Sequence, residues 1–214
     1  INKIHTCIGG SLGGQQALEW VVSNPDLVEN LILMATNART SPWGIALNET
    51  QRMAIKTDKT WGQKNEKAGE EGMKVARAIA LLSYRSYETY EKTQEDPVDE
   101  LENLRAVTYQ QYQGEKFAKR FNAYSYWAMT KLLDSHNVGR KRGGVAKALE
   151  QVKSKTLIIG IKTDVLFPTR EQEYLHKYIK NSELEIIDSL FGHDGFLIET
   201  EKIEAIINKF FNSH

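Results

Sequence analysis

The hexapeptide GGSLGG at residues 9–14 constrains the fold more than any other stretch, because it sets a serine among four glycines. The apolar run KIHTCI precedes it, and QQALEWVVSN follows with the spacing of an amphipathic helix. A tight turn from a strand into a helix strains its central residue and leaves its neighbours no room for a Cβ. The pattern G-x-S-x-G therefore makes Ser11 a candidate nucleophile. A plain glycine-rich turn and a phosphate-binding turn are the alternatives.

Both ends of the sequence predict α/β structure. Residues 2–36 read as strand, helix and strand, and the second strand is an apolar run of the kind that suits a parallel sheet covered on both faces. Towards the C-terminus, KTLIIGI and SELEIIDS predict two more strands, and helices are expected over residues 169–180 and 199–212. We therefore predict that residues 1–38 and 154–214 form one α/β core.

The middle of the chain, residues 39–153, has a different character. It is richer in charged residues, Gln and Tyr, and it lacks apolar runs of the strand type. Helical spacing is clearest over residues 70–93, and further helices are predicted within residues 95–121 and 123–136. The charged residues 88–103 suit a solvated surface or loop. We predict that this middle segment is a helical lid insertion.

Composition narrows the classes of function. Lys plus Arg and Asp plus Glu both number 28, so the formal net charge is +0 and a nucleic-acid partner is not expected. No apolar run reaches the length of a membrane span, and no signal peptide is recognisable, so no membrane partner is expected either. The single cysteine, Cys7, forms no intrachain disulfide, which fits a reducing, cytoplasmic environment. No metal-ligand spacing appears, so neither a metal nor a redox cofactor is expected.

A serine nucleophile needs a general base and a carboxylate that orients the base. An α/β-hydrolase sheet supplies them in the order Ser, Asp or Glu, His, with the acid after a late strand and the histidine after the last strand. His193 directly follows the last predicted strand, and Asp164 follows KTLIIGI. Asp188 is the rival acid, but it lies only five residues before His193. The backbone amide of Leu12, at the start of the first helix, is the expected oxyanion donor.

Seven stretches of the sequence, taken in order, resemble those of one known family. They are GGSLGGQQALEW, NETQRMAI, VARAIALLSYRS, YQGEKFAKRF, DSHNVGRKRGG, IGIKTDVLFP and GHDGFLIE. Over essentially its whole length the sequence resembles homoserine O-acetyltransferases, which are α/β-hydrolase-fold acyltransferases of methionine biosynthesis. It departs from the usual family pattern at Leu12, where methionine is common, and at Asn137, where aspartate is more usual.

The resemblance implies an activity and a mechanism. It implies transfer of an acetyl group from acetyl-CoA, the co-substrate, to the hydroxyl of L-homoserine. Ser11 would be the nucleophile, and Asp164 and His193 would complete its triad. It further implies a cytoplasmic homodimer.

The resemblance also implies that Arg77, Tyr84 and Asp194 bind substrate. Arg77 and Tyr84 are seven residues apart on one predicted helix, so they share a face, and an arginine there suits the carboxylate of an amino acid. Asp194 suits its ammonium group. From the residues alone, an exposed helix charge, a packing tyrosine and a capping aspartate are the alternatives. The basic residues 139–144 could contact CoA phosphates, although an exposed loop is the simpler interpretation.

Family members carry a substantial segment before the serine turn, including early strands and a second oxyanion donor. We therefore expect this chain to be the C-terminal two-thirds of such an enzyme, inactive by itself. Three alternatives remain open at this point. A related acyltransferase would use succinyl-CoA or serine, a hydrolase (an esterase or thioesterase) would use water as the acceptor, and a binding module would keep the triad without catalysis.

Overall fold

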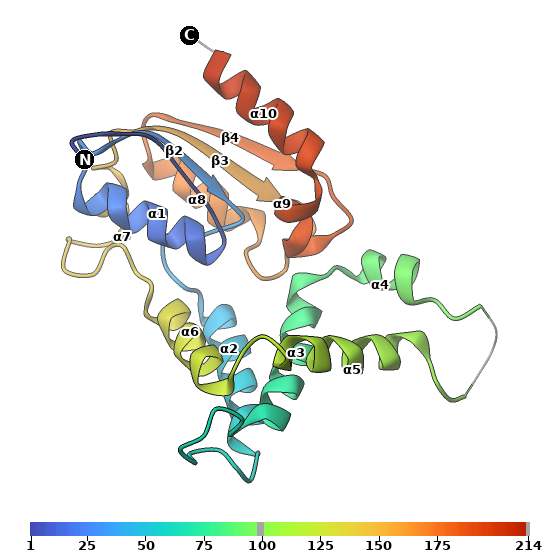
Figure 1. Ribbon diagram of the computed structural model, residues 1–214. Helices are drawn as coiled ribbons and strands as arrows, with labels where there is room; N and C mark the ends of the chain where they lie inside the picture. The colour runs from blue at the N-terminus through green and yellow to red at the C-terminus, as the bar shows by residue number, and fades with distance from the viewer. Residues whose placement is uncertain (98–100, 213–214) are drawn as a thin grey trace. The chain divides into compact units, whose positions relative to one another are not determined.

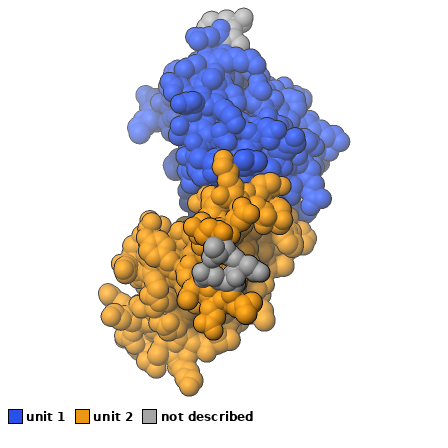
Figure 2. Space-filling view, turned by 90° about the vertical axis from the view of Figure 1, so that its right-hand side faces the viewer, with its two compact units in different colours: residues 1–40, 136–214 blue, residues 41–135 orange. Residues whose placement is uncertain are grey.

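The computed structural model describes residues 1–97 and 101–212. The chain forms two compact units, which Figure 2 shows in different colours. Unit 1 comprises residues 1–40 and 136–214 and holds the β-sheet, whereas unit 2 comprises residues 41–135 and is helical. Within the described residues, none of the helices combines the length and the apolar character that a bilayer crossing requires.

Unit 1 is built on a parallel sheet with the strand order β1-β2-β3-β4 (Figure 1). The strands are β1 (Ile4–Gly10), β2 (Val28–Met34), β3 (Lys155–Ile161) and β4 (Ser182–Ile187). Gly10 pairs with Met34, and Met34 pairs with Ile159, so the carboxyl ends of these strands lie together at one edge. In parallel sheets that edge is where functional side chains gather. The predicted α/β architecture is confirmed.

Helices cover both faces of this sheet, as its weakly alternating apolar strands predict. On one face, α1 (Leu12–Ser23), α7 (Val145–Leu149) and α8 (Thr169–Tyr178) share a core with Leu31 and Leu33 of β2. On the other face lies α10 (Thr200–Asn212), as Figure 1 shows. It shares a core with Ile32 of β2. The short helices η1 (Gly192–Asp194) and α9 (Gly195–Ile198) lie between β4 and α10 along the chain.

Unit 2 contains helices α2 (Pro42–Lys56), α3 (Glu70–Tyr84), α4 (Tyr87–Gln94), α5 (Arg105–Ala118) and α6 (Ala123–Ser135). Its core is formed by Ile55, Met73, Ala76, Ala123 and Tyr126. Next to this core, Arg52 is only 2% exposed and forms ion pairs of 2.7 Å with both Glu49 and Asp134. The buried ion pair to Asp134 ties α2 to α6.

Residues 70–93 form two helices rather than the one helix predicted. Arg85 is extended, and the side chain of Ser86 accepts a hydrogen bond from the amide of Thr89 at 3.1 Å, which caps a new helix. Of the predicted helical segment 95–121, α5 covers residues 105–118, and the charged segment 88–103 is partly helix α4. Residues 98–100 of both predictions lie outside the described residues.

The helical unit is shorter than the predicted insertion of residues 39–153, because residues 39–40 and 136–153 belong to unit 1. Val138, Ala148, Leu149 and Val152 are buried in the core that α1 and α8 share. A short antiparallel connection holds the two chain segments that flank unit 2. The amide of Thr40 donates to the carbonyl of His136 at 3.1 Å, the amide of Val138 donates to that of Ala38 at 3.0 Å, and Arg39 bridges to Asn137.

Candidate active site

Ser11 lies at the sharp turn from β1 into α1 and has the strained backbone that the sequence predicts. Its φ of 53° and ψ of −124° are rare for a residue with a side chain. The amide of Ser11 donates to the carbonyl of Met34 at 2.9 Å, which fixes the turn against the end of β2. The residue as a whole is only partly buried.

Three of the four glycines around Ser11 are required by close contacts. A Cβ on Gly9 would overlap the carbonyl of Gly13, and a Cβ on Gly10 would overlap the ring of Phe196. A Cβ on Gly14 would lie 2.7 Å from the methyl group of Thr36. Gly13 differs, because a Cβ there would meet no atom within 4 Å among the described residues beyond its chain neighbours and the backbone of its own helix. The expectation that crowding explains all four glycines is therefore wrong for Gly13.

The structure brings the predicted base and acid to Ser11. His193 Nε2 lies 3.0 Å from Ser11 Oγ, and His193 Nδ1 lies 2.7 Å from Asp164 Oδ2. The side chain of Asp164 is completely buried, and that of His193 is 5% exposed. A continuous series of hydrogen bonds thus runs from a buried carboxylate through an imidazole to the hydroxyl of the partly buried Ser11. This arrangement can transfer a proton from the hydroxyl during nucleophilic attack.

Backbone and aromatic groups hold Asp164 and His193 in place. Asp164 follows β3, and its Oδ1 accepts hydrogen bonds from the amides of Leu166 and Phe167, both at 2.8 Å. His193 lies in η1, where the rings of Phe167 and Phe196 are each centred 5.3 Å from the imidazole. Both carboxylate oxygens of Asp164 are therefore occupied by donors, and the imidazole is packed between two rings.

The rival acid Asp188 is not placed for this role. Its side chain is 77% exposed and lies 3.5 Å from the ammonium group of Lys162. Leu12 is the first residue of α1, so its amide belongs to the helix N-terminus, where N–H groups and the helix dipole favour negative charge. Among the described residues, no group of three or more His, Cys, Asp or Glu side chains could hold a metal ion.

The other predicted residues divide between the two units. In unit 2, the guanidinium of Arg77 lies 5.3 Å from the centre of the Tyr84 ring and 5.0 Å from that of Phe117. The buried Nε of Arg77 has no hydrogen-bond partner among the described residues. In unit 1, Asp194 follows His193 directly and is partly exposed. Arg77 and Tyr84 thus share a helix face as predicted, and the free donor of Arg77 is suited to an anion.

The basic residues 139–144 are not simply a free loop. The guanidinium of Arg142 donates to the carbonyl of Val138 and to Ser23 Oγ, both at 2.9 Å, and it pairs with Glu19. Two of these partners, Glu19 and Ser23, belong to α1. Arg142 therefore fastens this segment to α1.

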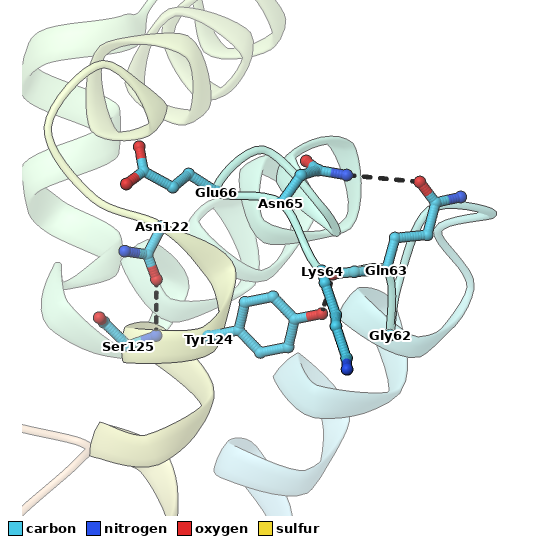
Figure 3. Close-up of a pocket in the computed structure, with 8 residues that line it drawn as sticks. All are labelled: Gly62, Gln63, Lys64, Asn65, Glu66, Asn122, Tyr124 and Ser125. Carbon is cyan, nitrogen blue, oxygen red and sulfur yellow. Dashed lines mark hydrogen bonds between the residues drawn. The ribbon is translucent and has the colours of Figure 1, made fainter.

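A surface hollow of about 650 Å³ in unit 2 is lined by Gly62, Gln63, Lys64, Asn65, Glu66, Asn122, Tyr124 and Ser125 (Figure 3). None of these residues was predicted to be functional. Their polar groups largely bond to one another: Tyr124 donates to the carbonyl of Gln63 at 2.6 Å, and Asn122 accepts from the amide of Ser125 at 2.8 Å. The hollow carries no arrangement comparable to that at Ser11.

The sequence analysis did not identify Thr36 and Gln172, which are both buried. Thr36 donates a hydrogen bond to the carbonyl of Ser11, and Gln172 donates one to the carbonyl of Thr36. Their only signal in the sequence is position. Thr36 comes two residues after β2 and Gln172 lies in the first turn of α8, both at the sheet edge where Ser11 lies.

Comparisons with known proteins agree with this fold. Residues 1–200 match the family model of the alpha/beta hydrolase fold. The chain is 47% identical to a homoserine O-acetyltransferase of Cyclobacterium marinum, over 99% of this chain and 60% of that relative. The crystal structure of homoserine O-acetyltransferase from Staphylococcus aureus is 33% identical in sequence, with a TM-score of 0.82. The match includes 100% of this chain and 61% of the Staphylococcus aureus chain. The acetyl esterase MekB has 25% identity and a TM-score of 0.87, over 100% of this chain and 63% of its own. The chain thus spans about three-fifths of the length of the proteins that it matches.

Proposed function

Because the chain belongs to the α/β-hydrolase fold family, we propose that Ser11, His193 and Asp164 catalyse the transfer of an acetyl group from acetyl-CoA to the hydroxyl of L-homoserine. The hydrogen-bonded series of these three side chains is the observation that carries the proposal. The similarity to curated homoserine O-acetyltransferases supports the choice of substrates. On the same resemblance we place the reaction in methionine biosynthesis, in a cytoplasmic homodimer.

The reaction proceeds in two acyl transfers. His193 Nε2 accepts the proton of Ser11 as Oγ attacks the thioester carbonyl, and the protonated imidazole returns that proton to the departing CoA sulfur. The homoserine hydroxyl then attacks the acetyl-serine ester while His193 accepts its proton, and the proton passes to Ser11 Oγ as O-acetylhomoserine leaves. The amide of Leu12, at the N-terminus of α1, stabilises the oxyanion in both steps.

Arg77, Tyr84 and Asp194 bind homoserine in this proposal. The buried Nε of Arg77, which has no hydrogen-bond partner among the described residues, supports pairing with the carboxylate of the amino acid. The ring of Tyr84 is centred 5.3 Å from that guanidinium, within the range of a cation–π contact. The partly exposed carboxylate of Asp194, one residue from His193, is suited to the ammonium group of the substrate.

The test measures thiol release from acetyl-CoA by the full gene product, with and without L-homoserine. We expect release that depends on homoserine and disappears in Ser11→Ala, because no acetyl-serine can form. Ser23→Ala, at the other end of α1, is the matched control and should keep the wild-type rate. Mass spectrometry of the protein mixed with acetyl-CoA alone should show an acetyl group on Ser11.

A hydrolase is the second candidate, because the acetyl esterase MekB shares the fold with a TM-score of 0.87. The same assay separates the two. Thiol release at equal rates with and without homoserine would reject the transferase and establish water as the acceptor. Release that requires succinyl-CoA or serine instead would keep the mechanism and change the substrate.

A further inference from the structure

Thr36 contacts the serine turn through both branches of its side chain. Its Oγ1 donates a hydrogen bond of 2.8 Å to the carbonyl of Ser11. Its methyl group occupies the space beside Gly14, where an added Cβ would lie only 2.7 Å away. Thr36 is 0% exposed, so neither contact competes with bulk solvent. The residue is therefore positioned to fix the turn itself.

The strained backbone of Ser11 needs such support. A non-glycine residue in this region costs roughly 1–3 kcal/mol and persists only where its surroundings hold it. The amide of Ser11 donates to Met34 at 2.9 Å, and its carbonyl accepts from the amide of Gln15 at 3.1 Å as well as from Thr36. The first two are main-chain bonds that any sequence of this fold could form. Of these three bonds, only that of Thr36 comes from a side chain.

Thr36 is itself held through its backbone carbonyl. Its carbonyl accepts a hydrogen bond of 2.7 Å from Nε2 of Gln172, a residue of α8 that is 0% exposed. The preceding residue, Ala35, has a φ of 44°, and its amide donates to Ile159 of β3 at 2.8 Å. These bonds join Thr36 to α8 and its neighbour Ala35 to β3, the strand that Asp164 follows. The turn that carries Ser11 and the strand that leads to Asp164 are thus connected through Thr36 and Ala35.

We propose that Thr36 is a positioning residue for the acyl transfer, which holds the Ser11 backbone so that Oγ stays at hydrogen-bond distance from His193. The proposal rests on the proposed role of Ser11 as nucleophile. It assigns the effect to the hydroxyl of Thr36 rather than to its bulk. Thr36→Val removes the hydroxyl and keeps the shape, whereas Thr36→Ser keeps the hydroxyl and removes the methyl group.

The experiment follows the reaction of Ser11 with a fluorophosphonate probe by mass spectrometry, in the full gene product and across a range of pH. We expect Thr36→Val to lower the plateau rate about tenfold, as the loss of one buried hydrogen bond implies. The midpoint of the pH profile should not move, because the hydrogen bond between His193 and Asp164 does not involve Thr36. Thr36→Ser should stay within about twofold of wild type, since it retains the donor.

Thr156→Val is the matched control. Thr156 is also 0% exposed, and its hydroxyl donates to the carbonyl of Ser154 at 2.9 Å, but it lies at the opposite end of the sheet, near the start of β3. Urea unfolding should show a comparable loss of stability in both valine variants, with the loss of Ser11 reactivity confined to Thr36→Val. If Thr36→Val does not fold, Gln172→Met, which releases the Thr36 carbonyl, should lower the rate severalfold.

Several results would overturn the proposal. Wild-type reactivity in Thr36→Val or in Gln172→Met would show that the contacts do not position Ser11. An equal loss in Thr36→Ser or in Thr156→Val would assign the effect to packing or to general stability. Failure of the wild-type protein to react at Ser11 refutes the proposed nucleophile, and the role of Thr36 falls with it. Reaction of wild type together with an unaffected Thr36→Val refutes only the role of Thr36.

Discussion

Asp164→Asn tests the chemistry of the site through the tautomer of His193. In the native protein, Oδ1 of Asp164 accepts from two backbone amides at 2.8 Å, and Oδ2 accepts from His193 Nδ1 at 2.7 Å. An asparagine has one oxygen for these three donors. If its oxygen faced His193, its NH₂ group would meet the two amides and leave both unsatisfied, at about 1–3 kcal/mol each. The NH₂ group therefore faces His193.

This orientation forces Nδ1 of His193 to accept a hydrogen bond, so the ring proton moves to Nε2 and the imidazole can no longer take the proton of Ser11. The two unsatisfied amides would cost about 2–6 kcal/mol, and a wrong-tautomer triad in serine proteases loses about 10⁴ in rate, or roughly 5 kcal/mol. We therefore expect Ser11 acylation to fall by about 10⁴-fold. The fold should remain intact, because the side chain keeps its size and the oxygen still accepts from both backbone amides.

The assay measures single-turnover acylation of Ser11 with an activated acetyl ester, alongside urea unfolding. Asp188→Asn is the control, since that carboxylate is 77% exposed and pairs with Lys162 rather than with His193. It should leave the rate unchanged. An Asp164→Asn protein that stays folded and keeps a rate within tenfold of wild type would refute the tautomer argument. If Asp188→Asn, and not Asp164→Asn, slowed the acylation of Ser11, Asp188 would be the carboxylate that orients His193.

Three other side chains give predictions of different kinds. Arg52→Met leaves the largely buried Asp134 without its cation, so urea unfolding should show unit 2 destabilised by about 3 kcal/mol. Burial lowers the pKa of His136 below 6.5. Just below pH 6.5, His136 is therefore protonated in the unfolded chain and still neutral in the folded protein. The free energy of unfolding should therefore fall as pH drops below about 6.5, and His136→Gln should flatten this decline in unfolding curves at pH 7 and pH 5. Arg77→Met should raise the KM for homoserine about 10–100-fold in steady-state assays and leave the acetylation of Ser11 by acetyl-CoA unchanged.

Controls keep these three outcomes interpretable. Lys209→Met breaks an exposed pair with Glu185 and should not change stability measurably. The double variant Arg52→Met, Asp134→Leu should recover much of the lost stability, and no recovery would contradict the buried-charge explanation. An unchanged pH dependence in His136→Gln would place the titrating group elsewhere. If Arg77→Met slowed the acetylation of Ser11 itself, a role confined to homoserine would be untenable.

Much of the site could be predicted because parallel strands end at one edge. Ser11, Asp164 and His193 each follow a strand in the sequence, so locating the strands was enough to bring the three residues together. The same reasoning preferred Asp164 over Asp188, and the structure supports that choice with a buried contact to His193 and an exposed pair for Asp188.

Other features depend on contacts that no local pattern records. The break between α3 and α4 comes from Ser86, whose capping role competes with helical spacing that continues past it. Residues 136–153 belong to unit 1 because Val138 and Leu149 reach a core formed by distant segments. Thr36 is a similar case, since its importance arises from a bond to Ser11, which lies 25 positions earlier in the chain.

The short connection between residues 38–40 and 136–138 has a consequence for how such a protein can diversify. β2 and β3 are neighbours in the sheet, and the chain segments that flank unit 2 are bonded to each other. For the sheet, the residues between these two segments therefore form one closed loop. The entropy of closing a loop grows only with the logarithm of its length, so even doubling it costs about 0.6 kcal/mol. Evolution can therefore lengthen, shorten or replace the helical unit at little thermodynamic cost to the strands that hold the reactive residues.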